Sequence, residues 1–229
     1  RVMTGIKRYL KASLEESIEK RKEHNKDWVP YLSDLRTLYV LTKDGAADKE
    51  TLQLVKKVLK RLPDNIGEMD SEYIAIAMIV KHALKEAVLK DGVKVLKFRL
   101  NHNDGTYLAY RGGSWPSIDR RLHIHTQVME AWQTVCPEDT ATIRGMQFWL
   151  LNQKRTQGWK SPIDCIDAVY ALTGGILPEK AESASVVQRD TLDISKNKSV
   201  VITNNGDGVM WAAVYGEYTL PMEQVKSAG

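Results

Sequence analysis

His123 and His125 are separated by one residue, the spacing in this sequence that comes nearest to a metal-binding pair. On a β-strand, both imidazoles of such a pair could bind one ion. The surrounding residues have helical spacing, however, and side chains two positions apart on a helix diverge by about 200°. No third ligand stands at motif spacing, so we predict structural histidines and no metal site.

Asp164, Cys165 and Asp167 form a second candidate cluster. Such residues carry the chemistry of some all-helical enzymes whose helix pairs form a closed α/α toroid. Terpenoid cyclases among them use acidic clusters, and prenyltransferases bind zinc with Asp, Cys and His. The sequence contains no Asp-x-Asp-Asp, and the two carboxylates follow Ser161 in the first turns of an expected helix. Exposed N–H groups and the helix dipole favour negative charge there. We therefore predict that both carboxylates cap the helix and face solvent.

A basic stripe occupies residues 51–62 and could meet an acidic partner surface. Lys56, Lys57, Lys60 and Arg61 alternate there with Leu and Val at helical spacing. That alternation is typical of an amphipathic helix with its charged side in water. We interpret the stripe as such a solvent-facing side.

Residues 148–172, FWLLNQKRTQGWKSPIDCIDAVYAL, place a polar, aromatic hinge between two apolar helical halves. Flat rings and fixed donors suit a desolvated protein contact. No paired carboxylates, Ser-His or Cys-His accompany them, so we predict no catalytic residue and no cofactor. We interpret the hinge first as a helix-hairpin corner and second as a contact surface. The possible contact residues are Trp115, Trp149, Gln153, Lys154, Arg155, Gln157 and Trp159.

The composition is that of an ordinary soluble chain. Its 229 residues are 43% hydrophobic and 27% charged, which suits one large domain or two unequal ones. The net charge of +4 is dispersed, which argues against nucleic acid as a partner. No window approaches the roughly 18 apolar residues that span a bilayer, so membrane association would need an anchor outside this sequence.

The two cysteines, Cys136 and Cys165, form no CxxC and no metal spacing. We interpret them as small buried hydrophobes, with a disulfide as the alternative.

Residues 2–177 are predicted to be helical almost throughout. Apolar residues recur at intervals of three and four, as in Ile6, Leu10, Leu14 and Ile18. Ser161-Pro162 and Gly174-Gly175 are a good start and a good end for a helix of about 12 residues.

Four segments can be aligned at Val40, Ala83, Ala131 and Ala171, which stand 43, 48 and 40 residues apart. Another helical run lies between each pair, so the repeat contains two helices. Small residues on every second helix suit close packing of an inner helix ring against an outer one. An open solenoid and a closed α/α toroid both meet that need.

After Pro178 the pattern changes to β. SVVIT and VMWAAVYGEYTL are rich in β-branched and aromatic residues, and residues 204–208 between them favour a hairpin turn. We therefore predict a helical domain over 1–180 and a β segment over 181–229.

Several of these stretches resemble one family. WLLNQKRTQGW followed by DAVYAL and a glycine pair is similar to the thioester-domain region of bacterial alpha-macroglobulins, especially those of Bacteroides-type bacteria. SIDRRLHIHTQVMEAW resembles the preceding inner helix, and GTYLAYRGGSW the loop before it. The segment from Val200 to Gly229 resembles the β structure that follows. The resemblance covers about 105–229, with a looser fit over 1–104.

The resemblance implies a mainly α fold, with a partial or complete α/α toroid over 1–180 and an incomplete CUB-like or macroglobulin sandwich over 181–229. It also implies a fragment of a long cell-envelope protein, periplasmic or outer-membrane associated, that entraps proteases. Its partners would be other domains of the same chain and the target proteases. Cys136 and Cys165 lack a Gln three positions on, so no thioester is assigned to this chain.

The function expected from the sequence is therefore that of a non-catalytic domain fragment. Two alternatives remain open: a toroid enzyme acting on a hydrophobic or glycan substrate, and a helical-repeat scaffold for protein binding.

Overall fold

The structure is a computed structural model, and it describes residues 2–43, 45, 47–103, 105–108, 118–159 and 161–174. All described elements belong to one unit, Arg1–Ile176, and Leu177–Gly229 are assigned to a second. The predictions for 181–229, for the turn at 204–208, and for Trp115 and Gly175 lie outside the described residues.

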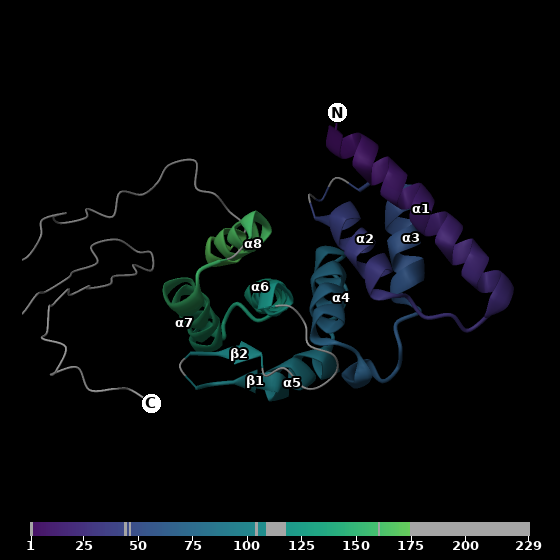
Figure 1. Cartoon of the computed structure of the whole chain (residues 1–229). Helices are drawn as coiled ribbons and strands as arrows, with labels where there is room; N and C mark the ends of the chain where they lie inside the picture. Colours follow the sequence, from purple (N-terminus) through teal and green to yellow (C-terminus); the bar gives the residue numbers. More distant parts are fainter. Residues whose placement is uncertain are drawn as a thin grey trace, which may run out of the picture. The chain divides into compact units, whose positions relative to one another are not determined.

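The described part of the chain is mainly helical, as predicted (Figure 1). Its longer helices are α1 (Val2–His24), α2 (Leu32–Thr42), α3 (Lys49–Leu59), α4 (Ser71–Ala83), α5 (Lys90–Arg99), α6 (Ile118–Val135), α7 (Thr140–Gln157) and α8 (Pro162–Leu172). A short 3-10 helix, η1 (Ile66–Glu68), precedes α4, and two short strands, β1 (Leu100–Asn101) and β2 (Tyr107–Leu108), follow α5.

Helices α2, α4, α6 and α8 pack in series, and we call these four helices the central row. Helices α1 and α3 pack on α2, α5 packs on α4, and α7 packs on α6. Figure 1 shows α4 between α2 and α6. The chain therefore alternates between a helix of the row and a helix beside it, as a repeat of two helices predicts.

The four aligned small residues all lie on the central row. Ala131 and Ala171 are buried where α6 packs on α8. Val40 is half-buried, and Ala83 is exposed at the end of α4. Ala131 and Ala171 are therefore buried between helices, whereas Ala83 is not, and close packing of an inner helix ring against an outer one stays a prediction.

Helix α4 forms the centre of the core. Its residues from Glu72 to Val80 are all buried, because α2, α5 and α6 pack around it. Large side chains of α2, α6 and α7 fill the rest of the core. The fully buried ones include Leu35, Leu38, Trp132, Met146 and Leu150.

The apolar stripe predicted for α1 is only half buried. Leu14 and Ile18 lie in the core, where α1 packs on α2. Ile6 is 43% exposed, and Val2 and Met3 are more exposed still. The first turns of α1 therefore add little to the core of this unit.

The two short strands are a departure from the nearly continuous helix predicted over 2–177. They pair antiparallel, Leu100 with Leu108 and Asn101 with Tyr107. The backbone N–H of Thr106 donates to the carbonyl of Gly145 on α7, at 2.9 Å. This contact requires glycine, because a Cβ at position 145 would lie 2.3 Å from the Thr106 hydroxyl oxygen.

The predicted ends of α8 are confirmed. The Ser161 side chain accepts a hydrogen bond from the N–H of Asp164 at 3.1 Å, and Pro162 occupies the first turn. Gly174 has a φ of 64°, in the left-handed region that favours glycine.

Gly145→Ala should destabilise the protein by about 1–3 kcal/mol, although alanine is the better helix former, because the new methyl group overlaps Thr106. Gly5→Ala is the matched control. Gly5 is also helical, and its added Cβ would meet nothing within 4 Å. It should stabilise by about 0.5 kcal/mol. Urea unfolding of both variants measures the difference, and equal effects would contradict the close contact.

Candidate functional site

Each helix of the central row contributes one charged side chain to a continuous polar chain, which we call the row network. Its members are Arg36 on α2, Glu72 on α4, His123 on α6 and Asp167 on α8. The network follows the packing order of the four helices. Its four members come from four separate helices.

Glu72 is the buried member of the row network, with 1% of its side chain exposed. Its Oε1 accepts from Arg36 Nε at 2.7 Å and lies 3.4 Å from His123 Nε2. Burial raises the pKa of this carboxyl, but the hydrogen bonds from His123 and Arg36 outweigh burial and hold the pKa below its usual value. Oε2 is buried and has no hydrogen-bond partner among the described residues.

His123 lies between two carboxylates. Its Nε2 faces Glu72, and its Nδ1 lies 2.7 Å from Asp167 Oδ2. The hydrogen bond with Glu72, helped by the one with Asp167, raises the pKa of His123 against the opposing effect of burial. Two carboxylates facing the two ring nitrogens favour the imidazolium form, which donates from both nitrogens.

A second cluster, the lysine cluster, joins α2, α6 and α8 nearer to their C-terminal ends. Tyr39 on α2 donates its hydroxyl to Glu130 on α6 at 2.8 Å. Lys43, directly after α2, hydrogen-bonds to the Tyr39 hydroxyl, and its Nζ lies 3.3 Å from Glu130. The same ammonium lies over the Tyr39 ring and over the ring of Tyr170 on α8, 4.2 and 4.0 Å from their centres.

Burial raises the pKa of Glu130, and the Lys43 charge opposes that rise. Gln133, one turn further along α6, donates to the carbonyl of Ala171 at 2.9 Å. Helices α6 and α8 are thus joined by polar contacts at both ends of their interface.

The lysine cluster brings together residues from equivalent positions of the repeat. Tyr39, Glu130 and Tyr170 each directly precede an aligned small residue, so they occupy equivalent positions on three helices of the row. All three contact Lys43. The matching sequences YVLT and YALT thus place both of their tyrosine rings against one ammonium.

The chemistry of the row network is that of a cross-link between helices. A histidine that acts as a general base needs one ring nitrogen free to face the substrate. Both nitrogens of His123 instead contact carboxylates, and Arg36 neutralises Glu72. The arrangement therefore ties four helices together, and Glu72 Oε2 is the oxygen of the network that has no hydrogen-bond partner among the described residues.

His125 is separate from the row network, as expected for two side chains that diverge on one helix. It is fully buried, its Nε2 lies 3.2 Å from the carbonyl of Met146, and its ring packs 4.4 Å from that of Trp149. Burial lowers the pKa of His125 to about 4, so the ring is neutral at physiological pH. Nδ1 has no hydrogen-bond partner in the described structure.

No group of three or more potential metal ligands occurs among the residues that the structure describes. Cys136 and Cys165 are both free and half-buried, so the disulfide alternative is wrong in this structure and full burial is wrong as well.

The two aspartates near the start of α8 have different roles. Asp164 completes a capping box with Ser161, which confirms the capping prediction for this residue, but it is buried, so the prediction that it faces solvent is wrong. The same prediction is wrong for Asp167, whose carboxylate turns to His123. Three positions on a helix separate the two side chains by about 300°, and the difference is enough to aim Asp167 at α6.

The predicted hinge is largely helical. Helix α7 continues to Gln157, and the corner is formed by Gly158, whose φ is 71°, together with Trp159. Lys154 lies 5.3 Å over the Trp159 ring, so these two predicted contact residues do meet. Gln153 is half-buried on α7; Arg155 and Gln157 lie in its last turn, with their side chains outside the described part.

Trp149 is turned away from that corner. Its ring stacks on Tyr107 of β2 at 5.5 Å and also packs against His125. The tryptophan therefore holds the hairpin against α6 and α7. The described part of the predicted contact surface consists of Gln153, Lys154 and Trp159.

Sequence reasoning did not single out Arg36, Glu72, Lys43 or Glu130. A signal was present for α2, because Arg36, Tyr39 and Lys43 recur at three and four and so share one side of the helix. Glu72 carried no comparable signal, since an acidic residue in a first helical turn is ordinarily a dipole contact.

Comparison of the chain with protein-family models, with curated proteins and with solved structures finds no match. Within the described residues, no helix has the length and apolar character needed to cross a membrane.

Asp167→Asn should lower the pKa of His123 towards the ordinary histidine value of about 6.5. It should also lower the free energy of unfolding at pH 6 by about 1 kcal/mol, a modest cost because both side chains are partly exposed to solvent. Because folding raises the pKa of His123, this contribution is complete below about pH 6.5 and is lost as pH rises through the folded-state pKa. NMR titration and urea unfolding at pH 6 and pH 9 measure both effects.

Asp91→Asn is the control, since Asp91 is 80% exposed and, among the described residues, its one ion pair is with Lys94 across 3.4 Å. It should leave stability and the His123 signal unchanged. His125 should titrate near 4 in every variant. A loss in Asp167→Asn that is the same at pH 6 and pH 9 would contradict an imidazolium held by Asp167.

Proposed function

We propose that this chain is a non-catalytic domain of an alpha-macroglobulin-like protein of the bacterial cell envelope, and that the central row is part of an α/α toroid. In that role the domain binds protein surfaces. Its partners are other domains of the same protein and the protease that the whole protein entraps.

One observation carries the non-catalytic part of the proposal. The charged groups of the row network and of the lysine cluster are all engaged with one another across helix interfaces. Such pairing favours a fixed geometry between helices, which a protein-binding domain needs, over a proton-transfer site, which needs an uncommitted group.

Two further observations support the family and the toroid. Residues 148–172 resemble the alpha-macroglobulin thioester-domain region, and the helices alternate between the row and its flanks as inner and outer toroid helices would. Gln153, Lys154 and Trp159 at the end of α7 supply an aromatic and polar surface suited to contact with another domain.

In this proposal the domain moves as a body. Cleavage elsewhere in the protein releases it from its neighbouring domains, and the new arrangement encloses the protease, a two-state displacement. The row network keeps the helices in one arrangement while the domain moves.

A second candidate function rests on Glu72. Its buried Oε2 has no hydrogen-bond partner in the described structure, and His123 lies beside it. A carboxyl group and an imidazole so close could serve general acid–base chemistry on a glycan or a hydrophobic substrate if Arg36 moved away.

The full-length protein should retain an added active protease in a complex that co-elutes in size-exclusion chromatography, and small-angle scattering should show a change in its dimensions after cleavage. A protease whose active site has been blocked beforehand should not be retained, because it cannot trigger the displacement. Unchanged scattering dimensions after cleavage, together with no retention of the active protease, would contradict the proposal.

Intact-mass measurement with methylamine separates the two ways of entrapment. Any methylamine adduct should map outside these 229 residues, because neither Cys136 nor Cys165 has the partner glutamine. The enzymatic candidate is tested on chromogenic glycosides, where hydrolysis that disappears in Glu72→Gln would favour it.

A further inference from the structure

A basic hollow lies between α1 and the end of α3. Five cationic side chains line it together with Trp28: Lys22, Lys56, Lys57, Lys60 and Arg61. Its volume is about 430 Å³, within the range of small-molecule sites. The lysine stripe predicted as the wet side of α3 does face solvent, but it also meets Lys22 of α1 across a concave surface.

The hollow holds more positive charge than its surroundings neutralise. Glu19 lies 2.5 Å from Lys22 and 3.9 Å from Lys57. Within the described residues, no carboxylate pairs with Lys56, Lys60 or Arg61. The ammonium groups of Lys22 and Lys57 are close enough that contact with Lys22 lowers the pKa of Lys57. Glu19 offsets part of this repulsion, and a further anion in the hollow would offset the charge that remains on Lys56, Lys60 and Arg61.

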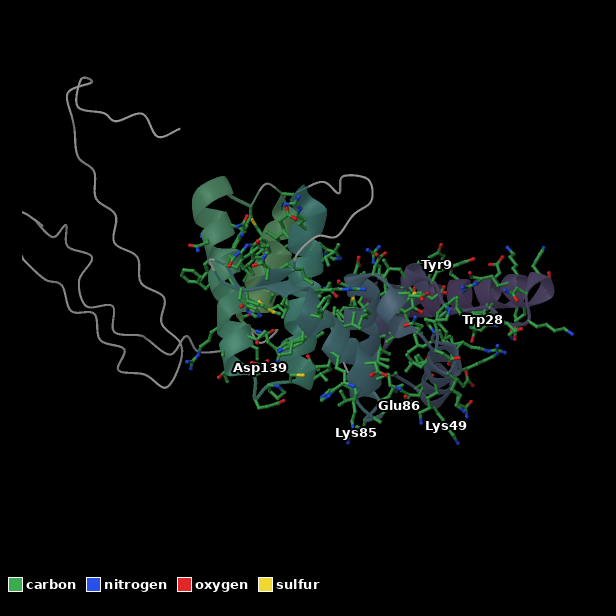
Figure 2. The ribbon with its side chains drawn as sticks, turned by 90° about the horizontal axis from the view of Figure 1, so that it is seen from below. Tyr9, Trp28, Lys49, Lys85, Glu86 and Asp139 are labelled. Carbon is green, nitrogen blue, oxygen red and sulfur yellow. The ribbon has the colours of Figure 1, made fainter. Side chains whose placement is uncertain are left out.

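Trp28 adds a second feature to the hollow. Its indole is 3% exposed and lies beside α1 (Figure 2), with the Arg61 guanidinium 5.7 Å from the ring centre. The indole N–H is buried and meets no acceptor among the described residues. A buried donor without an acceptor costs free energy, so a ligand oxygen brought towards it would be favoured.

We propose that this hollow binds a compact soluble ligand carrying two or more phosphate groups. Lys22 and Lys57 are placed to share one phosphate, and Arg61 offers the planar donor geometry that phosphate oxygens match. The concave shape and the small volume favour such a ligand over an acidic protein surface, which would need a broader contact area. This site is independent of the row network and of protease entrapment.

Calorimetric titration of the intact chain with inorganic tripolyphosphate, pyrophosphate and phosphate tests the proposal. One site per chain should be seen, with affinity rising from phosphate to tripolyphosphate and falling as salt is raised above about 0.15 M. Lys57→Ala should weaken tripolyphosphate binding about tenfold, and Lys22→Ala combined with Lys57→Ala about a hundredfold, since each removes a charge-assisted contact.

Lys94→Ala combined with Lys97→Ala is the matched control, because both residues are exposed on α5 and their loss changes the net charge equally. It should change affinity by less than about twofold. In NMR spectra the Trp28 indole N–H signal should shift and saturate with the same dissociation constant, and circular dichroism checks that each variant is folded.

Absence of saturable binding would overturn the proposal. Equal weakening in the α5 control would do the same, since it would mean that only net charge is sensed. So would a Trp28 signal that stays in place while signals elsewhere move.

Discussion

Burial of one carboxylate, that of Glu72, is the constraint on which the arrangement of the helices depends. A charge inside a protein must be paired, because its desolvation costs several kcal/mol. Helix α4 contains no cation beside Glu72, so the partners come from α2 and α6, as Arg36 and His123. His123 then carries the pairing to α8 through Asp167. Four helices are thereby fixed in one register by a requirement that hydrophobic packing alone would not impose.

Much of the fold was predictable from the sequence, because helix periods and caps are local. The Ser161 cap and the left-handed Gly174 follow from residues close together in the chain, and the alternation of two kinds of helix follows from the spacing of the aligned segments. The hairpin at 100–108 was missed because its stability comes from α7, through Gly145 and Trp149, about 40 residues away. The spacing of apolar residues within one segment cannot indicate a contact with a segment so far away in the sequence.

The site was less predictable than the fold for a related reason. His123 and Asp167 were both noted, yet each was assigned to its own helix, since 44 residues separate them. Glu72 carries the sequence signature of an ordinary first-turn carboxylate, and only tertiary packing converts it into a buried charge. By contrast, the lysines of α3 were correctly assigned to the solvent side, and only the approach of Lys22 from α1 turns that side into a hollow.

The two charged clusters differ in their pairing: the charges between the central helices are paired, whereas Lys56, Lys60 and Arg61 of the hollow pair with no carboxylate among the described residues. The paired group sits against α4, where nine consecutive residues, from Glu72 to Val80, are buried. A helix enclosed on every side has no local opening that exposes its backbone without separating α2 and α6 from it. Its amide protons should therefore exchange with solvent deuterium only when the whole unit unfolds, which makes α4 the slowest-exchanging segment of the described chain and a direct gauge of its global stability.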